Sequence, residues 1–84
     1  MITHVAIIYQ GKTYSLPRPN RHHHVFHLIY DELGHSGGEN EQGFLDENGK
    51  FYDRFQALAH ALYHKQVMDE SKIRANRLFS EDLW

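Results

Sequence analysis

The chain has 84 residues, a formal net charge of −2 and no cysteine. This length is close to the minimum for one stable core, so it predicts a single domain over residues 1–84 without disulfide bonds. The acidic balance argues against a nucleic-acid polymer as partner. No apolar run is long enough to span a membrane, and the first residues lack the basic and apolar segments of a signal peptide. We therefore expect a soluble intracellular protein.

The small size also favours self-association. A domain this short buries little apolar surface by itself, and a subunit interface would add to that burial. The chain is rich in aromatic residues that are suited to such an interface. We therefore expect a homo-oligomer whose interface draws on Phe26, Tyr30, Tyr63, Phe79 and Trp84.

The N-terminal segment has the pattern of a β-hairpin. Residues 3–9 are β-branched and apolar, Gln10-Gly11 is a turn signal, and residues 12–16 alternate between polar and apolar. Pro17 and Pro19 then end the hairpin.

A first helix is expected from Arg21 to about Leu33. Asn20 is a suitable N-cap and Gly34 a suitable C-terminal stop. Because a helix turns about 100° per residue, His22 lies near the core-facing side and His23 on a different side. The expected apolar face consists of Val25, Leu28, Ile29 and Leu33.

The segment 34–42 is polar and rich in glycine, which predicts a mobile loop, and we expect residues 35–41 to act as a lid. Residues 43–45 and 50–52 flank Asp46-Glu47-Asn48-Gly49, and the Asn-Gly pair predicts a second hairpin.

A second helix is expected over about residues 54–67, with Asp53 as its N-cap. Its expected core face is Phe55, Leu58, Ala59 and Leu62. The segment 78–84 ends on a large aromatic residue, which favours a packed tail. The predicted fold class is therefore α+β: hairpin, helix, hairpin, helix and a packed C-terminal tail.

Eight residues are histidine, and four of them lie within residues 21–27. The first turn of a helix offers free N–H groups and partial positive charge to an anion. Arg21, His22 and His23 would add a guanidinium and two imidazoles there. Histidine can also transfer protons near neutral pH. The segment therefore predicts a site for a phosphate-bearing ligand, for proton transfer, or for both.

A metal site is the other possibility for histidines. His23 and His27 are four residues apart, as are His60 and His64, so either pair would share a helix face. No cysteine or suitably spaced carboxylate completes either set. We expect no metal and no other cofactor, although the sequence leaves open whether either pair binds a metal.

Five segments carry a resemblance to known proteins: residues 11–17, Arg21-His22-His23 with Val25, residues 41–45, residues 49–54 and residues 78–84. With these segments the chain resembles a family of small tailed-phage and prophage proteins that have Arg-His-His, Glu-Gln-Gly-Phe and C-terminal Leu-Phe-Ser-Glu-Asp-Leu-Trp motifs. Relatives often carry Asp where this chain has His24, and this departure puts in doubt any mechanism that needs a carboxylate there.

The resemblance implies a phage protein that acts in the cytoplasm of the host bacterium. By analogy with phage antagonists of nucleotide-based immunity, it would neutralise a signal of the CBASS or Thoeris type. Richness in histidine slightly favours metal-independent cleavage of a phosphodiester in a cyclic nucleotide. The alternative is a sponge that sequesters a cyclic ADP-ribose-type signal or a cyclic dinucleotide unchanged.

For cleavage, His22 and His23 would supply the base and the acid, and Arg21 or Arg54 would stabilise charge on the phosphate. For sequestration, Phe44 or Tyr52 would stack on the base. As site residues, Glu81 or Asp82 would orient an imidazole or accept a hydrogen bond from a ribose hydroxyl; otherwise Ser80 caps a final turn and both carboxylates are solvated. The expected pocket combines the catalytic candidates with ligand-binding Arg21, Gln42, Gly43, Phe44, Arg54, Glu81 and Asp82.

Overall fold

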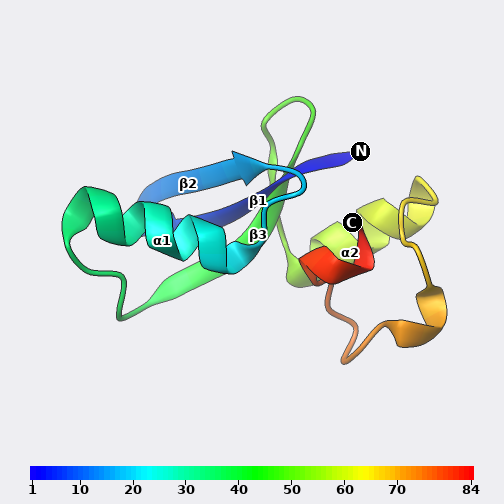
Figure 1. The fold of residues 1–84 in the computed structure, drawn as a ribbon. Coiled ribbons are helices and arrows are strands. Elements are labelled where there is room, and N and C mark those ends of the chain that lie inside the picture. Colours follow the sequence, from blue (N-terminus) through cyan, green and yellow to red (C-terminus); the bar gives the residue numbers. More distant parts are fainter.

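The computed structural model describes residues 1–84 as a four-stranded antiparallel sheet with two α-helices (Figure 1). The predicted α+β class and the order hairpin, helix, hairpin, helix are confirmed. The elements are β1 (Ile2–Tyr9), β2 (Lys12–Pro17), α1 (His22–Leu33), β3 (Asn40–Asp46), β4 (Phe51–Asp53) and α2 (Arg54–Tyr63), followed by the short 3₁₀ helices η1 (Glu70–Lys72) and η2 (Ser80–Asp82).

The sheet has the strand order β2-β1-β3-β4, so β1 pairs with both β2 and β3. Alternate residues of a strand point to opposite faces. Val5, Ile7 and Tyr9 of β1 are therefore on one face, and all three are almost completely buried. α1 lies across the sheet in Figure 1, and its Val25 and Ile29 join the same hydrophobic cluster. None of the helices is both long and apolar enough to cross a lipid bilayer.

α1 begins one residue later than predicted. Arg21 is the N-cap, and its backbone N–H donates to Nδ1 of His24, 2.8 Å away. The side chain of Asn20 instead donates to the carbonyl of Pro17. The expectation that Asn20 caps the helix was therefore wrong, because its amide is used in the preceding turn. Gly34 ends the helix in the left-handed conformation as predicted, with φ 78°.

α2 is shorter than predicted and turns a different face to the core. It ends at Tyr63, and Lys65 has a positive φ of 55°. The side chain of Gln66 then bonds to both the N–H and the carbonyl of Ile2, at 2.8 and 2.6 Å. Of the four residues expected on the core face, only Leu58 is buried. Phe55 is 54% exposed, Leu62 is 36% exposed and Ala59 is exposed, whereas Ala57 and Ala61 are buried.

The C-terminal tail is packed, as predicted. Leu78 is fully buried and Leu83 is 8% exposed. The indole Nε1–H of Trp84 donates to the carbonyl of Asn20 at 3.0 Å, so the tail reaches the start of α1. Figure 1 shows this segment beside α2, at the end of the sheet where α1 begins.

The segment expected to act as a mobile lid divides into two parts: residues 35–39 form a loop, and Asn40 and Glu41 already belong to β3. The loop follows Gly34, whereas the expected site lies at the first turn of α1, about 18 Å away along a 12-residue helix. The hydroxyl of Tyr9 hydrogen-bonds to His35 Nδ1 at 2.8 Å and to the Gly37 carbonyl at 2.7 Å. Part of the loop is therefore anchored to β1 and cannot close over the start of α1.

Candidate functional site

His22 is buried at the start of α1 and joins this helix to β3. It is 8% exposed, its Nε2–H donates to the Gly43 carbonyl at 2.8 Å, and its ring meets Phe44 edge-on with centroids 5.0 Å apart. Burial lowers the pKa of His22 to about 4 and outweighs the opposing effect of the Gly43 hydrogen bond. At neutral pH the ring is therefore uncharged and its Nε2 is occupied, as in a structural histidine.

Gly43 permits this packing because it has no side chain. A Cβ atom there would lie 2.2 Å from the backbone oxygen of Tyr52 and 2.5 Å from a ring carbon of Phe51. The neighbouring Phe44 is fully buried. The expected stacking of a ligand base on Phe44 is therefore contradicted, because this ring belongs to the core.

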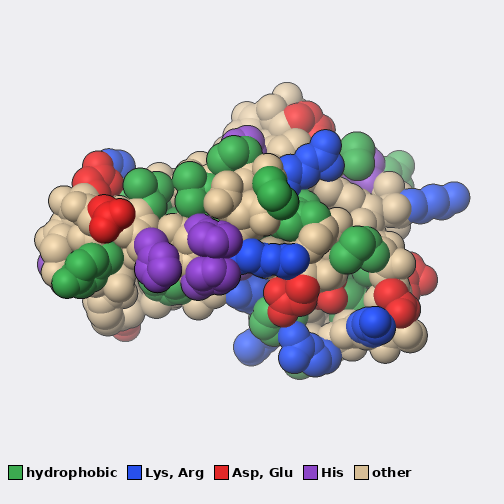
Figure 2. Space-filling view, in the orientation of Figure 1, with side chains coloured by type: hydrophobic (Ala, Val, Ile, Leu, Met, Phe, Trp, Pro, Cys, Tyr) green, Lys and Arg blue, Asp and Glu red, His purple; other side chains and the backbone are tan.

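The other histidines of residues 21–27 lie on the outer side of α1. His23 is exposed, and its ring centroid is 4.0 Å from that of His24 and 6.0 Å from that of His27. Figure 2 shows histidine side chains gathered over α1 next to a basic side chain. Partial burial and the neighbouring His23 lower the pKa of His24. His22 and His23 therefore do not face one ligand, and the expected acid–base pair is not formed.

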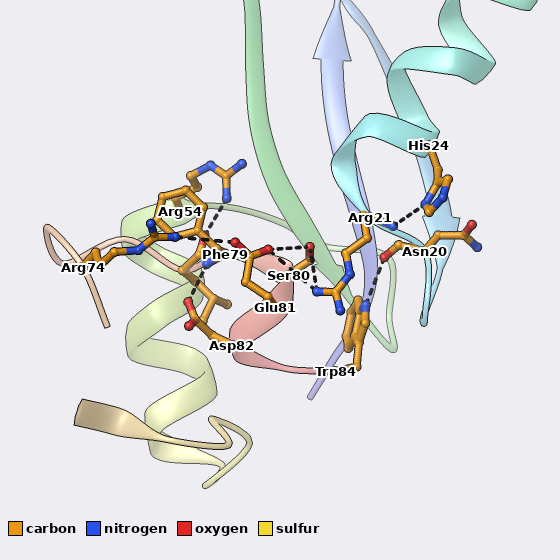
Figure 3. Close-up of polar contacts among 11 residues, drawn as sticks. Asn20, Arg21, His24, Arg54, Arg74, Phe79, Ser80, Glu81, Asp82 and Trp84 are labelled. Atoms are coloured by element: carbon orange, nitrogen blue, oxygen red, sulfur yellow. Dashed lines mark hydrogen bonds and ion pairs between the residues drawn. The ribbon is translucent and has the colours of Figure 1, made fainter. Parts of the chain in front are cut away.

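The side chain of Arg21 points to the C-terminal segment, whereas its backbone N–H bonds to His24 (Figure 3). Its Nη1 lies 3.4 Å from Ser80 Oγ and 3.7 Å from Glu81 Oε2. Arg74 approaches the other carboxylate oxygen of Glu81 at 3.5 Å. Glu81 is thus shared by two guanidinium groups at long distances. Exposed ion pairs of this kind contribute little to stability.

Arg54 connects this region to the sheet. Its guanidinium donates to the Leu78 carbonyl and to Gln42 Oε1, both at 2.7 Å, and the Leu78 N–H donates back to the Arg54 carbonyl at 3.0 Å. The guanidinium carbons of Arg54 and Arg74 lie 4.5 and 4.6 Å from the ring centroid of Phe79. Burial lowers the pKa of Arg54, but an arginine in a protein stays protonated.

A groove of about 310 Å³ opens beside Arg54. Its walls carry the guanidinium groups of Arg54 and Arg77, the amide of Gln42 and the exposed ring of Phe55. The guanidinium of Arg77 lies 5.1 Å from the Phe55 ring centroid. We call this surface the arginine groove; it is lined by Asn40, Glu41, Gln42, Asp53, Arg54, Phe55 and Arg77.

The predicted site residues therefore do not come together in one pocket. Gln42 and Arg54 line the arginine groove, and Arg21 and Glu81 meet beside it. His22, Gly43 and Phe44 form a core contact, and His23 lies outside on α1. Asp82 has a structural contact, because its Oδ2 accepts from the Phe79 N–H at 2.9 Å.

Sequence reasoning missed Arg74, Arg77 and the exposed position of Phe55. The available signal was the high share of arginine near the tail, since two of the five arginines lie within the four residues before the Leu78–Trp84 segment. Metal binding has little geometric support. No group of three histidine, cysteine or carboxylate side chains is arranged to hold a metal ion.

Comparison with known proteins supports a phage origin and gives no activity. No curated protein and no solved structure matches the chain. The family model described as phage T4 y16D protein matches residues 1–84. This match confirms the expectation of a small phage protein family. The chain belongs to the phage T4 y16D protein family.

Proposed function

We propose that this phage protein sequesters a host immune nucleotide signal in the cytoplasm of the infected bacterium, without cleaving it. The observation that carries the proposal is the arginine groove. It places the guanidinium groups of Arg54 and Arg77 beside the exposed ring of Phe55, in a space of about 310 Å³. Guanidinium groups bind phosphate by paired hydrogen bonds, and an exposed aromatic ring can stack on a base.

The fixed position of the Arg54 guanidinium supports the binding of a phosphate-bearing ligand. The guanidinium is fixed by Leu78 and Gln42, so little conformational entropy would be lost when a phosphate docks beside it. Glu41 and Asp53 on the groove wall are suited to accept hydrogen bonds from ribose hydroxyls. A cyclic dinucleotide or a cyclic ADP-ribose-type signal carries all three of these groups: phosphate, base and ribose.

Arg21 and Arg74 extend the positive surface. Both contact Glu81 only at 3.7 and 3.5 Å, and this carboxylate is 57% exposed. A second phosphate of the ligand could compete with Glu81 for these arginines at small cost, because an exposed ion pair is weak.

Sequestration is favoured over cleavage by the state of His22. Cleavage of a phosphodiester next to a 2′-hydroxyl needs a base and an acid at one ligand. Nε2 of His22 donates to Gly43 and its ring is buried, while His23 is on the outer side of α1. The groove itself is lined by no histidine.

The test is titration calorimetry of the pure protein with cyclic dinucleotides and cyclic ADP-ribose species, followed by heat denaturation and chromatography of the released ligand. Binding and recovery of unchanged ligand are expected. Arg77→Ala should weaken binding by roughly 1.5–3 kcal/mol, the range for a hydrogen bond to a charged group. Arg18→Ala is the matched control, because this exposed arginine lies outside the groove.

Two outcomes would contradict the proposal. The absence of binding across the whole panel would exclude a nucleotide sponge for these signals. Altered products without added metal would instead favour cleavage, and His23→Ala would then be expected to reduce turnover at least about a hundredfold.

A further inference from the structure

A second pocket lies on α2, between its outer side and strand β4. Its volume of about 560 Å³ is within the range of roughly 300–1,000 Å³ that is typical of small-molecule sites. We call it the Ala59 pocket. It is lined by Lys50, Phe51, Tyr52, Gln56, Ala59, His60 and Tyr63, and it shares none of these residues with the arginine groove.

The shape of the pocket suits a flat ring. Gln56, Ala59, His60 and Tyr63 follow one another at helical spacing along one side of α2. Ala59 has only a methyl group, which leaves space between the larger neighbours. Tyr63 is 83% exposed, so its ring is available on this side.

His60 is the most unusual residue of the pocket. Its ring stands next to those of Tyr52 and His64, with both centroid distances 4.5 Å. Its Nε2 is the one buried side-chain nitrogen or oxygen of the protein without a hydrogen-bond partner. Buried polar atoms are nearly always paired, because an unpaired one destabilises the fold. Rotation of the imidazole would let a ligand with a hydrogen-bonding edge supply the partner.

The polar groups at the rim differ in their charge. The ammonium of Lys50 lies 5.2 Å from the Tyr52 ring centroid. The side-chain oxygen of Gln56 accepts from the Asp53 N–H at 3.1 Å, so its NH₂ group remains available to a ligand. The rim therefore offers one cation and one amide donor to a ligand that has an anionic substituent.

We propose that the Ala59 pocket binds a planar heteroaromatic ring of the nucleobase type. The ring stacks on Tyr63 and hydrogen-bonds to His60, and an anionic substituent lies at Lys50. This inference concerns a different surface from the arginine groove and does not depend on the proposed function.

The experiment is an NMR titration with adenosine, guanosine, cytidine and uridine, and with the 5′-monophosphate of the nucleoside that binds best. These nucleosides carry the ring without a phosphate. The Ala59 methyl and the His60 ring signals should shift in a saturable way. Tyr63→Ala should weaken binding roughly 5- to 150-fold, the ratio that corresponds to roughly 1–3 kcal/mol of base stacking. Ala59→Leu should abolish binding by filling the pocket.

The controls separate this pocket from other surfaces. Tyr30→Ala removes a 58% exposed tyrosine from α1 and should leave binding unchanged. Arg77→Ala should also leave the nucleoside-induced shifts of the Ala59 and His60 signals unchanged, whatever it does to binding in the arginine groove. Lys50→Met should weaken binding of the monophosphate more than that of the nucleoside. Circular dichroism should show native helix content for each variant.

The inference is overturned if no nucleoside shifts the Ala59 and His60 signals at millimolar concentration. It is equally overturned if folded Ala59→Leu binds like the wild type. A loss of the Ala59 and His60 shifts in Arg77→Ala would mean that they report on binding in the arginine groove, and it would also refute the inference.

Discussion

Acidification should destabilise the fold through His22. The folded protein holds this ring uncharged, because it is buried with its Nε2 donating to Gly43. In the unfolded chain the ring is in water and takes up a proton at higher pH. Since burial lowers the pKa of His22 in the folded state, the unfolded state binds more protons below neutrality. The stabilisation is therefore complete above the pKa that His22 has in the unfolded chain. It is lost as the pH falls towards the lower pKa that His22 has in the folded protein.

The size of the effect follows from the two pKa values. A folded pKa of about 4 against an ordinary value of 6.5 predicts a loss of about 2 kcal/mol between pH 7 and pH 5, and about 3 kcal/mol by pH 4. Such a loss is a substantial part of the free energy of unfolding of a small domain. His24 and His60 also have lowered pKa values and change stability in the same direction.

The measurement is urea denaturation at pH 7 and pH 5, with the fluorescence of Trp84 as the signal that reports unfolding. His22→Gln removes the titrating group and keeps an N–H donor for Gly43. This variant should lose about 2 kcal/mol less than the wild type between the two pH values. His27→Gln, which removes an exposed imidazole from the same helix, is the matched control. An equal loss in wild type and His22→Gln would refute the reasoning.

Three further substitutions test the packing around the site by the same denaturation assay. Gly43→Ala should destabilise by more than about 2 kcal/mol, because its Cβ would lie 2.2 Å from the Tyr52 oxygen; near-wild-type stability would contradict the tight approach. Gln66→Ala should cost roughly 1–3 kcal/mol, since it removes both hydrogen bonds to Ile2, and an unchanged midpoint would argue against them. Asp53→Ala should lower the free energy of unfolding by about 1 kcal/mol through the loss of the α2 N-cap. Asp53→Asn should keep most of the wild-type stability, because asparagine is also a good N-cap.

Local patterns in the sequence predicted the hairpins, the start of α2 and the environment of His22. Helical spacing put His22 on the side of Val25 and Ile29, and all three are buried. The Asn48-Gly49 pair correctly predicted the turn between β3 and β4. These features depend on neighbours within a few residues, so periodicity and turn chemistry were sufficient.

The errors concern contacts between distant parts of the chain. α2 ends early where the side chain of Gln66 pairs with Ile2, 64 residues away. Its core face was misplaced because apolar residues occur around most of this helix, and its contacts with β3, β4 and β1 decide which of them are covered. Arg74 and Arg77 are joined by a turn in which Ala75 and Asn76 have positive φ values of 53° and 54°, and only the asparagine signals such a conformation. Gln42 and Arg54 were predicted as site residues, but the sequence did not indicate that this turn would bring Arg77 to the same groove.

The bond from Trp84 to Asn20 has a consequence for the order of folding. It closes a separation of 64 residues, as does the pairing of Gln66 with Ile2, and such distant contacts are slow to form. The sheet and α1 can assemble from nearer segments, but Arg21, Arg54 and Arg74 meet only when the tail docks. A ligand bound among these arginines would hold the last part of the chain in place. It should therefore slow hydrogen exchange in the tail more than in the sheet.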